Sequence, residues 1–298
     1  MTDRPTDRPT DRPTDRPTDR PTPAPFGARL QAATAARGRL CVGIDPHAAL
    51  LRAWGLDDDV AGLERFALSA TEALAPYCSV LKPQSAFFER FGSRGVAVLE
   101  RVVATAREAG ALVLMDAKRG DIGSTSQAYA EAYLDPSSPL ASDAVTVSPY
   151  LGFGSLTPFV ETARAHGAGL LVLALTSNPE GPEVQHATAP DGRSVAGVVL
   201  DHLRALNAGV DDDGLGSFGA VVGATVDPAT EDLDVRGPLL APGFGAQGGT
   251  VADLRRVFGP AARLVLPSSS REVLAAGPDP VALRDAVART HDALAALG

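Results

Sequence analysis

The chain has 298 residues, 45% of them hydrophobic, a formal net charge of -9 and a pI near 5.0, which suits one large core and argues against nucleic-acid binding, since that needs basic residues concentrated on one face. No apolar run reaches the roughly 18 residues of a membrane span, and the N-terminus lacks the apolar segment of a secretory signal. We therefore expect a cytoplasmic protein that binds neither nucleic acid nor a membrane.

The first residues form a low-complexity repeat. From Thr2 to Pro21 the unit Thr-Asp-Arg-Pro occurs five times. Proline at every fourth position favours extended backbone, and each charge-neutral unit has almost nothing apolar to bury. We predict a disordered tail over residues 1–24 and a single catalytic domain over residues 25–298.

After Phe26 the sequence alternates between short β-rich runs and longer Ala-, Leu- and Arg-rich segments with helical spacing, the pattern of successive βα units. The alternation repeats about eight times, and an early glycine-rich dinucleotide turn is missing, so we predict an α/β fold of the (β/α)8 barrel type rather than a doubly wound open sheet. The expected strands, with helix-like segments between successive members, are Leu40–Ile44, Ser79–Leu81, Leu112–Met115, Ala144–Val147, Leu170–Leu175, Ala220–Val222, Leu239–Ala241 and Leu264–Leu266.

Metal-binding patterns are missing from this sequence. Cys41 and Cys78 lie beside Val or Leu in strand-like runs without the spacing of a zinc site, so we expect two small core residues. The five histidines are scattered without ligand spacing. The acidic runs at 57–59 and 211–213 are interpreted as solvated loops.

Barrel enzymes take their active-site residues from strand ends and the loops that follow, and here two of those ends carry the scarcest charged residue of the chain. The chain has 27 Lys plus Arg, but Lys occurs only at 82 and 118, leaving 25 arginines. A lysine ammonium can donate a proton to a reacting centre, whereas a guanidinium stays protonated. The two lysines therefore point to proton-transfer chemistry; two lysines kept by chance on the surface are the alternative.

Carboxylates surround the second lysine. Asp116 and Lys118 are two residues apart at a strand end, so their side chains should point to the same side while strand geometry lasts. Asp121 follows in the turn, and a nearby carboxylate keeps a partly buried lysine protonated. We predict that Lys118 is held as an acid; an ordinary surface ion pair, which stabilises little, is the alternative.

A glycine-rich segment after the seventh expected strand suggests a phosphate site. Gly243 to Gly249 matches G-x-G-x-x-G, but so late in the chain the dinucleotide interpretation is weak. In barrels the loops after strands seven and eight commonly bind phosphate through backbone amides. Gln247 and Arg271 could add side-chain donors to the phosphate oxygens.

Taken together, these motifs resemble the orotidine 5′-phosphate decarboxylase family, in particular the subgroup typical of actinobacteria, over Leu40 to Arg271. The most specific element is the Asp-x-Lys-x-x-Asp of Asp116, Lys118 and Asp121. The segments that carry the resemblance are 42–46, 81–84, 87–89, 116–125, 177–179 and 242–249.

The resemblance implies a reaction and a set of roles. Orotidine 5′-phosphate would lose carbon dioxide to give UMP, with no metal and no organic cofactor. Lys118 would protonate C6 of the pyrimidine and Asp116 would lie against the departing carboxylate. Lys82 would order the charges and bind ribose, whose hydroxyls Asp45 would also bind, and Ser177 would contact the pyrimidine.

The same resemblance places the remaining site residues. Gln247 and Arg271 would bind the phosphate together with Ser270, which stands where the wider family usually has glycine and so departs from its pattern. Asp121 and Thr125 would reach into the neighbouring subunit's site, which implies a homodimer. The Gly- and Pro-rich stretch 178–193 is the candidate lid.

Two other functions fit part of the pattern. A magnesium-dependent sugar-phosphate lyase or decarboxylase of the wider group shares the Asp-x-Lys-x-x-Asp element, but a cation at Lys82 would repel the metal. A catalytically silent barrel that only binds a nucleotide is the second, and the intact set of Lys82, Asp116, Lys118 and Asp121 argues against it.

Overall fold

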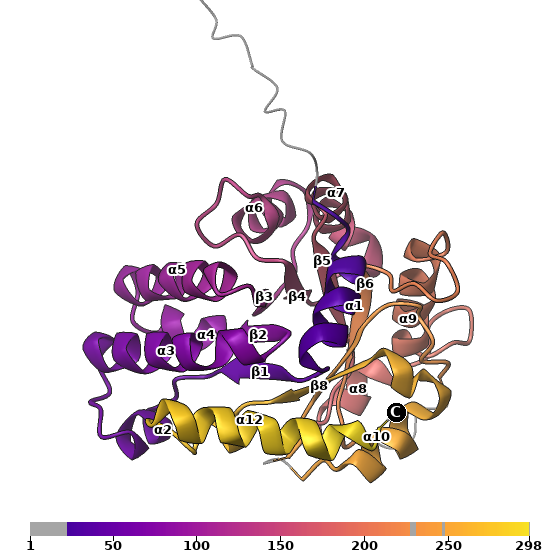
Figure 1. Ribbon diagram of the computed structural model, residues 1–298. Coiled ribbons are helices and arrows are strands. Elements are labelled where there is room, and N and C mark those ends of the chain that lie inside the picture. Colours follow the sequence, from indigo (N-terminus) through magenta and orange to yellow (C-terminus); the bar gives the residue numbers. More distant parts are fainter. Residues whose placement is uncertain (1–22, 227–230, 246–247, 298) are drawn as a thin grey trace, which may run out of the picture.

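The computed structural model describes residues 23–226, 231–245 and 248–297. In that part of the chain, eight parallel strands close into a barrel in sequence order, from β1 next to β2 around to β8 next to β1 (Figure 1). The strands are β1 Cys41–Ile44, β2 Val80–Pro83, β3 Leu112–Arg119, β4 Ala144–Val147, β5 Gly169–Leu175, β6 Phe218–Val222, β7 Leu239–Pro242 and β8 Val265–Ser269.

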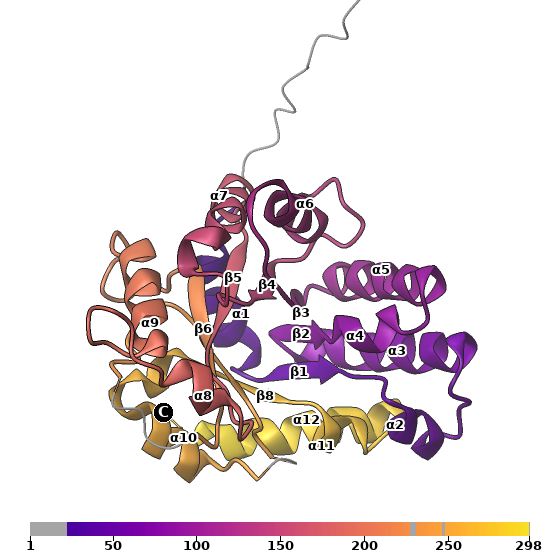
Figure 2. The same cartoon turned by 180° about the vertical axis from the view of Figure 1, so that it is seen from behind.

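Helices surround the barrel, and two views from opposite sides show them on its flanks (Figures 1 and 2). Some of them begin with side-chain caps: the Asp59 side chain accepts from Gly62 N at the start of α3, and Thr250 with Asp253 forms a capping box on α10. The helices are α1 Phe26–Arg37, α2 Ala48–Ala53, α3 Val60–Leu74, α4 Ser85–Glu89, α5 Ser93–Glu108, α6 Gly123–Leu134, α7 Thr157–His166, α8 Gly181–Gln185, α9 Val195–Leu206, α10 Val251–Phe258, α11 Arg271–Leu274 and α12 Pro280–Ala295.

Alternate strand residues build two separate apolar clusters. Because successive side chains of a strand point to opposite faces, one set packs outward against the helices and the other fills the barrel. The inner cluster is Cys41, Val80, Leu114, Ala144, Leu171, Val221, Leu240 and Leu266, with Phe26 and Leu30 of α1. Each inward position two residues further along a strand lies one layer nearer the C-terminal mouth.

Helix α1 forms the floor of the barrel. Phe26 and Leu30 are each 1% exposed and belong to the inner cluster. Arg29 of the same helix pairs with Asp143, just before β4, and donates to the Gly167 carbonyl at 3.0 Å. The N-terminal end of the barrel is thus covered by apolar side chains and anchored by one arginine.

The predicted barrel is confirmed, with differences at element boundaries. All eight expected strands are present and the open sheet is excluded. The expected helix between the sixth and seventh strands was wrong for the described residues there, 223–226 and 231–238, which form no helix. Strand β3 continues to Arg119, so Lys118 lies within the strand rather than after it, as Lys82 does in β2.

Two predictions concern residues that the structure does not describe. The predicted tail lies outside the described residues except for Pro23 and Ala24. Gln247 also lies outside them.

Cys41 and Cys78 are confirmed as free, buried core residues. Burial raises the pKa of the Cys41 thiol to about 12, which makes it inert at neutral pH.

Candidate active site

A single carboxylate joins both lysines of the chain at the mouth of the barrel. Lys82 Nζ donates to Asp116 Oδ2 at 3.0 Å, and Lys118 Nζ donates to Asp116 Oδ1 at 2.5 Å. The side chains of Lys82 and Asp116 are 7% and 8% exposed, whereas that of Lys118 is 44% exposed. The expectation that the Asp116 and Lys118 side chains point to the same side of the strand is confirmed. Lys82 reaches them from the neighbouring strand β2.

The register of the sheet explains this convergence. Lys82 follows Val80 and Asp116 follows Leu114 by two residues, so both point into the barrel above the inner apolar cluster. Neighbouring strands β2 and β3 bring them side by side. Gln84, two residues after Lys82, forms a parallel β-bridge with Asp116. Its side-chain Oε1 accepts from Lys118 Nζ at 3.4 Å.

Burial and charge act in opposite directions on this group. Burial by itself raises the pKa of Asp116, but the charges of Lys82 and Lys118 outweigh it and hold that pKa well below its usual range. Burial by itself lowers the pKa of Lys82, but Asp116 and Asp45 outweigh it and hold that pKa above its ordinary value. Lys82 and Asp116 thus both stay charged at neutral pH.

A cavity of about 230 Å³ adjoins Lys82. It brings together three residues predicted from different strand ends, namely Asp45, Lys82 and Arg271, together with Ser270. The lining residues come from the ends of β1, β2, β7 and β8 and the segments that follow: Asp45, His47, Lys82, Gln84, Ala86, Phe87, Pro242, Gly243, Phe244, Ser268, Ser270 and Arg271.

Polar atoms near the ends of β1 and β8 face one another. The Ser270 hydroxyl donates to Asp45 Oδ2 at 2.6 Å. Among the described residues, the buried Asp45 Oδ1 and His47 Nε2 have no hydrogen-bond partner. Burial, and then the charge of Arg271, lower the pKa of His47, so its imidazole is neutral at pH 7. Ser270 therefore connects the predicted ribose residue to the strand end that carries Arg271.

The glycine-rich loop is shaped by left-handed backbone. Gly243 and Gly245 have φ of 94° and 77°, a region that side chains disfavour. A Cβ on Gly245 would meet Glu272 Oε2 at 1.7 Å. Glycine at 245 is therefore favoured by its φ, whereas the Glu272 carboxylate that a Cβ would meet is the end of a flexible side chain that can move aside.

Five predicted residues do not line this cavity: Asp116 and Lys118, which form the lysine network next to it, and Asp121, Thr125 and Ser177. Asp121 Oδ1 accepts from the backbone N–H of Ile122, and the described residues give it no ion pair with either lysine. Thr125 and Ser177 are exposed, Thr125 in α6 and Ser177 in the segment after β5. Within the described chain Asp121 therefore forms no ion pair with Lys118, and its place in the site stays a prediction.

The residues missed by sequence reasoning are His47 and Thr146. His47 could have been suspected from its place two residues after Asp45, at the end of β1. Thr146 gave no signal, because its role depends on pairing between β3 and β4. Its hydroxyl donates to Asp116 Oδ1 at 2.9 Å and accepts from Lys118 N at 3.0 Å.

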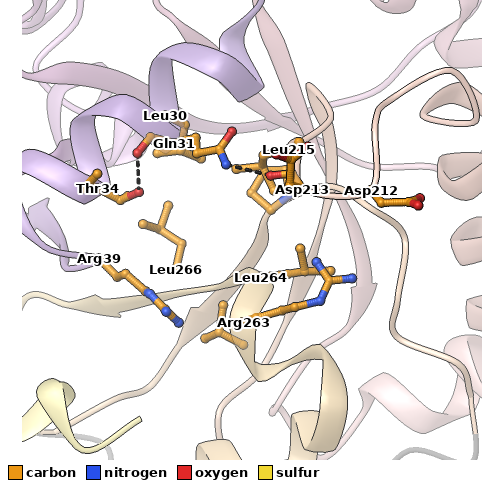
Figure 3. Close-up of a pocket in the computed structure, with 14 residues that line it drawn as sticks. Leu30, Gln31, Thr34, Arg39, Asp212, Asp213, Leu215, Arg263, Leu264 and Leu266 are labelled. Atoms are coloured by element: carbon orange, nitrogen blue, oxygen red, sulfur yellow. Dashed lines mark hydrogen bonds between the residues drawn. The ribbon is translucent and has the colours of Figure 1, made fainter. Parts of the chain in front are cut away.

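A larger cavity, about 530 Å³, lies at the opposite end of the barrel (Figure 3). It is bounded by α1 and by the segments that lead into β6, β7 and β8. Leu30, Leu215 and Leu266 supply apolar walls, with Arg39 and Arg263 at its edge. Its lining contains no lysine, and catalytic residues of barrel enzymes lie at the other face, so size does not identify the active site here.

Neither a metal-binding cluster nor a membrane-spanning helix occurs among the described residues. No group of three or more His, Cys, Asp or Glu side chains is arranged to hold a metal ion. No helix there is long and apolar enough to cross a membrane.

Comparisons with known proteins place this geometry in one family. The sequence model described as "Orotidine 5'-phosphate decarboxylase / HUMPS family" matches residues 38–286. The orotidine 5′-phosphate decarboxylase of Nocardioides sp. is 72% identical, covering 90% of this chain and 98% of the relative, and that of Streptomyces coelicolor is 67% identical, covering 89% and 95%. The solved structure of Leishmania donovani OMP decarboxylase is 31% identical with a TM-score of 0.71, covering 92% of this chain and 98% of its own.

Proposed function

This chain belongs to the orotidine 5′-phosphate decarboxylase / HUMPS family, and we infer from that membership that it converts orotidine 5′-phosphate to UMP and carbon dioxide in pyrimidine biosynthesis. The observation that carries the assignment within this structure is the Asp116 carboxylate held between Lys82 and Lys118. A preorganised cation beside a reacting carbon stabilises the charge that develops there.

We propose that the reaction proceeds without a cofactor, by protonation from lysine. The bond between C6 and the carboxylate carbon breaks and carbon dioxide leaves. The electron pair of that bond stays on C6. Lys118 Nζ transfers a proton to that carbon while Asp116 lies against the departing carboxylate. Because the Lys118 side chain is 44% exposed, the resulting amine can recover its proton from water, whereas the buried Lys82 keeps its own.

The substrate would extend from the lysines toward the end of β8. Lys82 and Asp45 bind the ribose hydroxyls, and Arg271 binds the phosphate with Gln247 and Ser270. The placement of ribose next to phosphate is supported by one cavity, which is lined by Asp45, Lys82, Ser270 and Arg271. Binding energy from the distant phosphate can then be used to order the reacting groups.

Ser177 is proposed to contact the pyrimidine, and the stretch 178–193 after it to act as a lid. A Cβ on Gly223, after β6, would lie 3.0 Å from Ser177 Cβ, so Ser177 packs beside the end of the neighbouring strand. The lid stretch includes α8, whose Gln185 side chain accepts from Thr176 N at 2.9 Å. This contact anchors the stretch to the end of β5.

A homodimer is proposed to complete the site, with Asp121 and Thr125 shared across the interface. Three large apolar side chains lie next to Asp121 or on the adjoining segment after β4: Ile122, Tyr150 and Leu151 are 62%, 77% and 52% exposed. The two segments are in contact, since Ser148 N donates to Arg119 O at 2.8 Å. Burying this patch against a second copy would remove apolar surface from water and carry Asp121 toward the partner.

The activity is tested by incubating the purified full-length protein with orotidine 5′-phosphate and following UMP and carbon dioxide together. We expect one UMP for each carbon dioxide released, without added metal or coenzyme. Binding of the nucleotide without release of carbon dioxide would instead indicate a catalytically silent barrel.

Shared residues are tested by subunit complementation. Lys118→Arg and Asp121→Ala are each expected to be inactive as homodimers, but a hybrid dimer would carry both changes in one site and neither in the other. Mixing and re-forming the dimers should restore about a quarter of wild-type activity, because half of random dimers are hybrids with one intact site. No recovery in verified hybrids would place Asp121 in its own subunit's site.

A further inference from the structure

Thr146 of β4 connects two parts of the lysine network. It is 1% exposed, its hydroxyl donates to Asp116 Oδ1 at 2.9 Å, and it accepts the backbone N–H of Lys118 at 3.0 Å. The directions of both bonds are fixed, because an ionised carboxylate only accepts and an amide N–H only donates. We propose that Thr146 is a positioning residue for proton transfer, which holds the Asp116 carboxylate and the Lys118 backbone in one fixed relation.

The backbone of Lys118 explains why a side chain is needed here. Its φ is 49°, in the left-handed region, which non-glycine residues rarely adopt. The β3–β4 register shifts at the same place: Met115 pairs with Val145, and the next pair is Arg119 with Val147. The Thr146 hydroxyl therefore satisfies an amide that is displaced from the regular ladder.

The orientation of Thr146 follows from its strand. It lies two residues after Ala144, a member of the inner cluster, while Val145 and Val147 belong to the outer one. Its side chain thus points into the barrel, in the same layer as Lys82 and Asp116. It does not line the cavity next to Lys82, so its effect on the reaction would pass through Asp116 and Lys118.

The two oxygens of Asp116 are held differently. Oδ2 accepts from the buried Lys82, while Oδ1 accepts from both Thr146 and Lys118. Without the hydroxyl, Lys118 alone would hold Oδ1, and its side chain is 44% exposed. The carboxylate could then turn about its link to Lys82, and the Lys118 ammonium could move with it.

The test compares Thr146→Val, which keeps the shape and removes the hydroxyl, with Thr146→Ser, which keeps the hydroxyl. This proposal rests on the proposed decarboxylation, so wild-type turnover of orotidine 5′-phosphate is measured first. For Thr146→Val we expect kcat to fall by about 10- to 100-fold, the range for a small misplacement of reacting groups, with KM little changed. Thr146→Ser should recover most of that loss.

Thr71→Val is the matched control. Thr71 of α3 is fully buried, and its hydroxyl donates to the Ala67 carbonyl of the same helix at 2.7 Å. This variant should lose stability but keep kcat. Circular dichroism checks that all variants are folded, and Thr146→Ala replaces Thr146→Val if the latter does not fold.

The outcomes separate the two claims. No turnover by the wild type would remove the proposed function itself. With an active wild type, unchanged kcat in folded Thr146→Val would overturn the positioning role. The positioning role would also be overturned if kcat fell as much in Thr146→Ser as in Thr146→Val, or if Thr146→Val changed only KM. A drop in kcat that serine rescues supports it.

Discussion

The two ends of the barrel carry charged residues and a cavity each, but they use charge differently. At the mouth, Lys82 and Asp116 are 7% and 8% exposed and pair with each other inside the barrel. At the floor, Arg263 pairs with Asp234 at 2.7 Å while both side chains are about half exposed, at 51% and 42%. The floor has the larger cavity, but its shielded ion pair, Arg29 with Asp143 at 24% and 10% exposed, does not line that cavity, whereas Lys82 lines the cavity at the mouth.

That difference shows where chemistry is possible. A charge removed from water interacts strongly with its neighbours, so the geometry of the mouth controls its protonation states. Exposed ion pairs at the floor are screened and contribute little. The following predictions test this contrast.

The largest expected effect follows from Lys118→Arg. Arginine keeps the positive charge beside Asp116 but does not give up a proton at ordinary pH. We expect kcat for carbon dioxide release to fall by about 10²- to 10⁴-fold, the range for loss of a general acid, with the fold retained by circular dichroism. Near-normal turnover would remove Lys118 from the mechanism.

Lys82→Met tests the buried half of the network. The change leaves the Asp116 carboxylate buried with only the exposed Lys118 as its cationic partner. Removing one member of a buried ion pair costs about 3–5 kcal/mol, so the free energy of unfolding in urea should fall by that order. A loss no larger than that of an exposed ion pair would show that water reaches Asp116.

The pH dependence of stability tests the same carboxylate. The pKa of Asp116 is lowered by folding, whereas an unfolded aspartate titrates near about 3.9. Its ionised form therefore stabilises the fold above about pH 4, and this contribution is lost as the pH falls toward the folded pKa. The free energy of unfolding should fall more steeply below pH 4 for the wild type than for Asp116→Asn. If the two free energies of unfolding fell in parallel with pH, the ionised Asp116 would not stabilise the fold.

Arg263→Ala is the matched change at the floor. It removes an exposed pair with Asp234, so the free energy of unfolding should change by less than about 1 kcal/mol. Steady-state kinetics should show unchanged kcat and KM. A clear loss of turnover would mean that the floor is linked to the reaction.

The smallest effect is expected from chelation. Lys82 places a positive charge where a divalent ion would otherwise be attracted, so EDTA should leave the rate of carbon dioxide release unchanged. Loss of activity that magnesium restores would favour the metal-dependent alternative.

Much of the site could be predicted from residue type and position. Lys82, Asp116, Lys118, Asp45 and Arg271 were found because each stands at or near a strand end, and parallel strands of a barrel bring those ends together. Gly243 and Gly245 were predicted within a glycine-rich loop that binds phosphate through backbone amides, and both have positive φ.

Residue spacing left the partners of two residues open. Asp121 follows Lys118 by three residues, but the spacing could not show that it accepts from the Ile122 N–H and forms no ion pair with Lys118 in this chain. Thr146 is distant from Asp116 in sequence and meets it only through strand pairing.

By itself, the sequence determined the βα order, the number of strands and the residue types at the mouth, because these depend on local periodicity and on which groups can donate a proton. Only the tertiary structure decided which atoms meet. The left-handed backbone of Lys118 lies within the register shift between β3 and β4, and the pairing of these strands brings Thr146 to Asp116. The two lysines then keep Asp116 ionised, because their charges outweigh the effect of burial on its pKa.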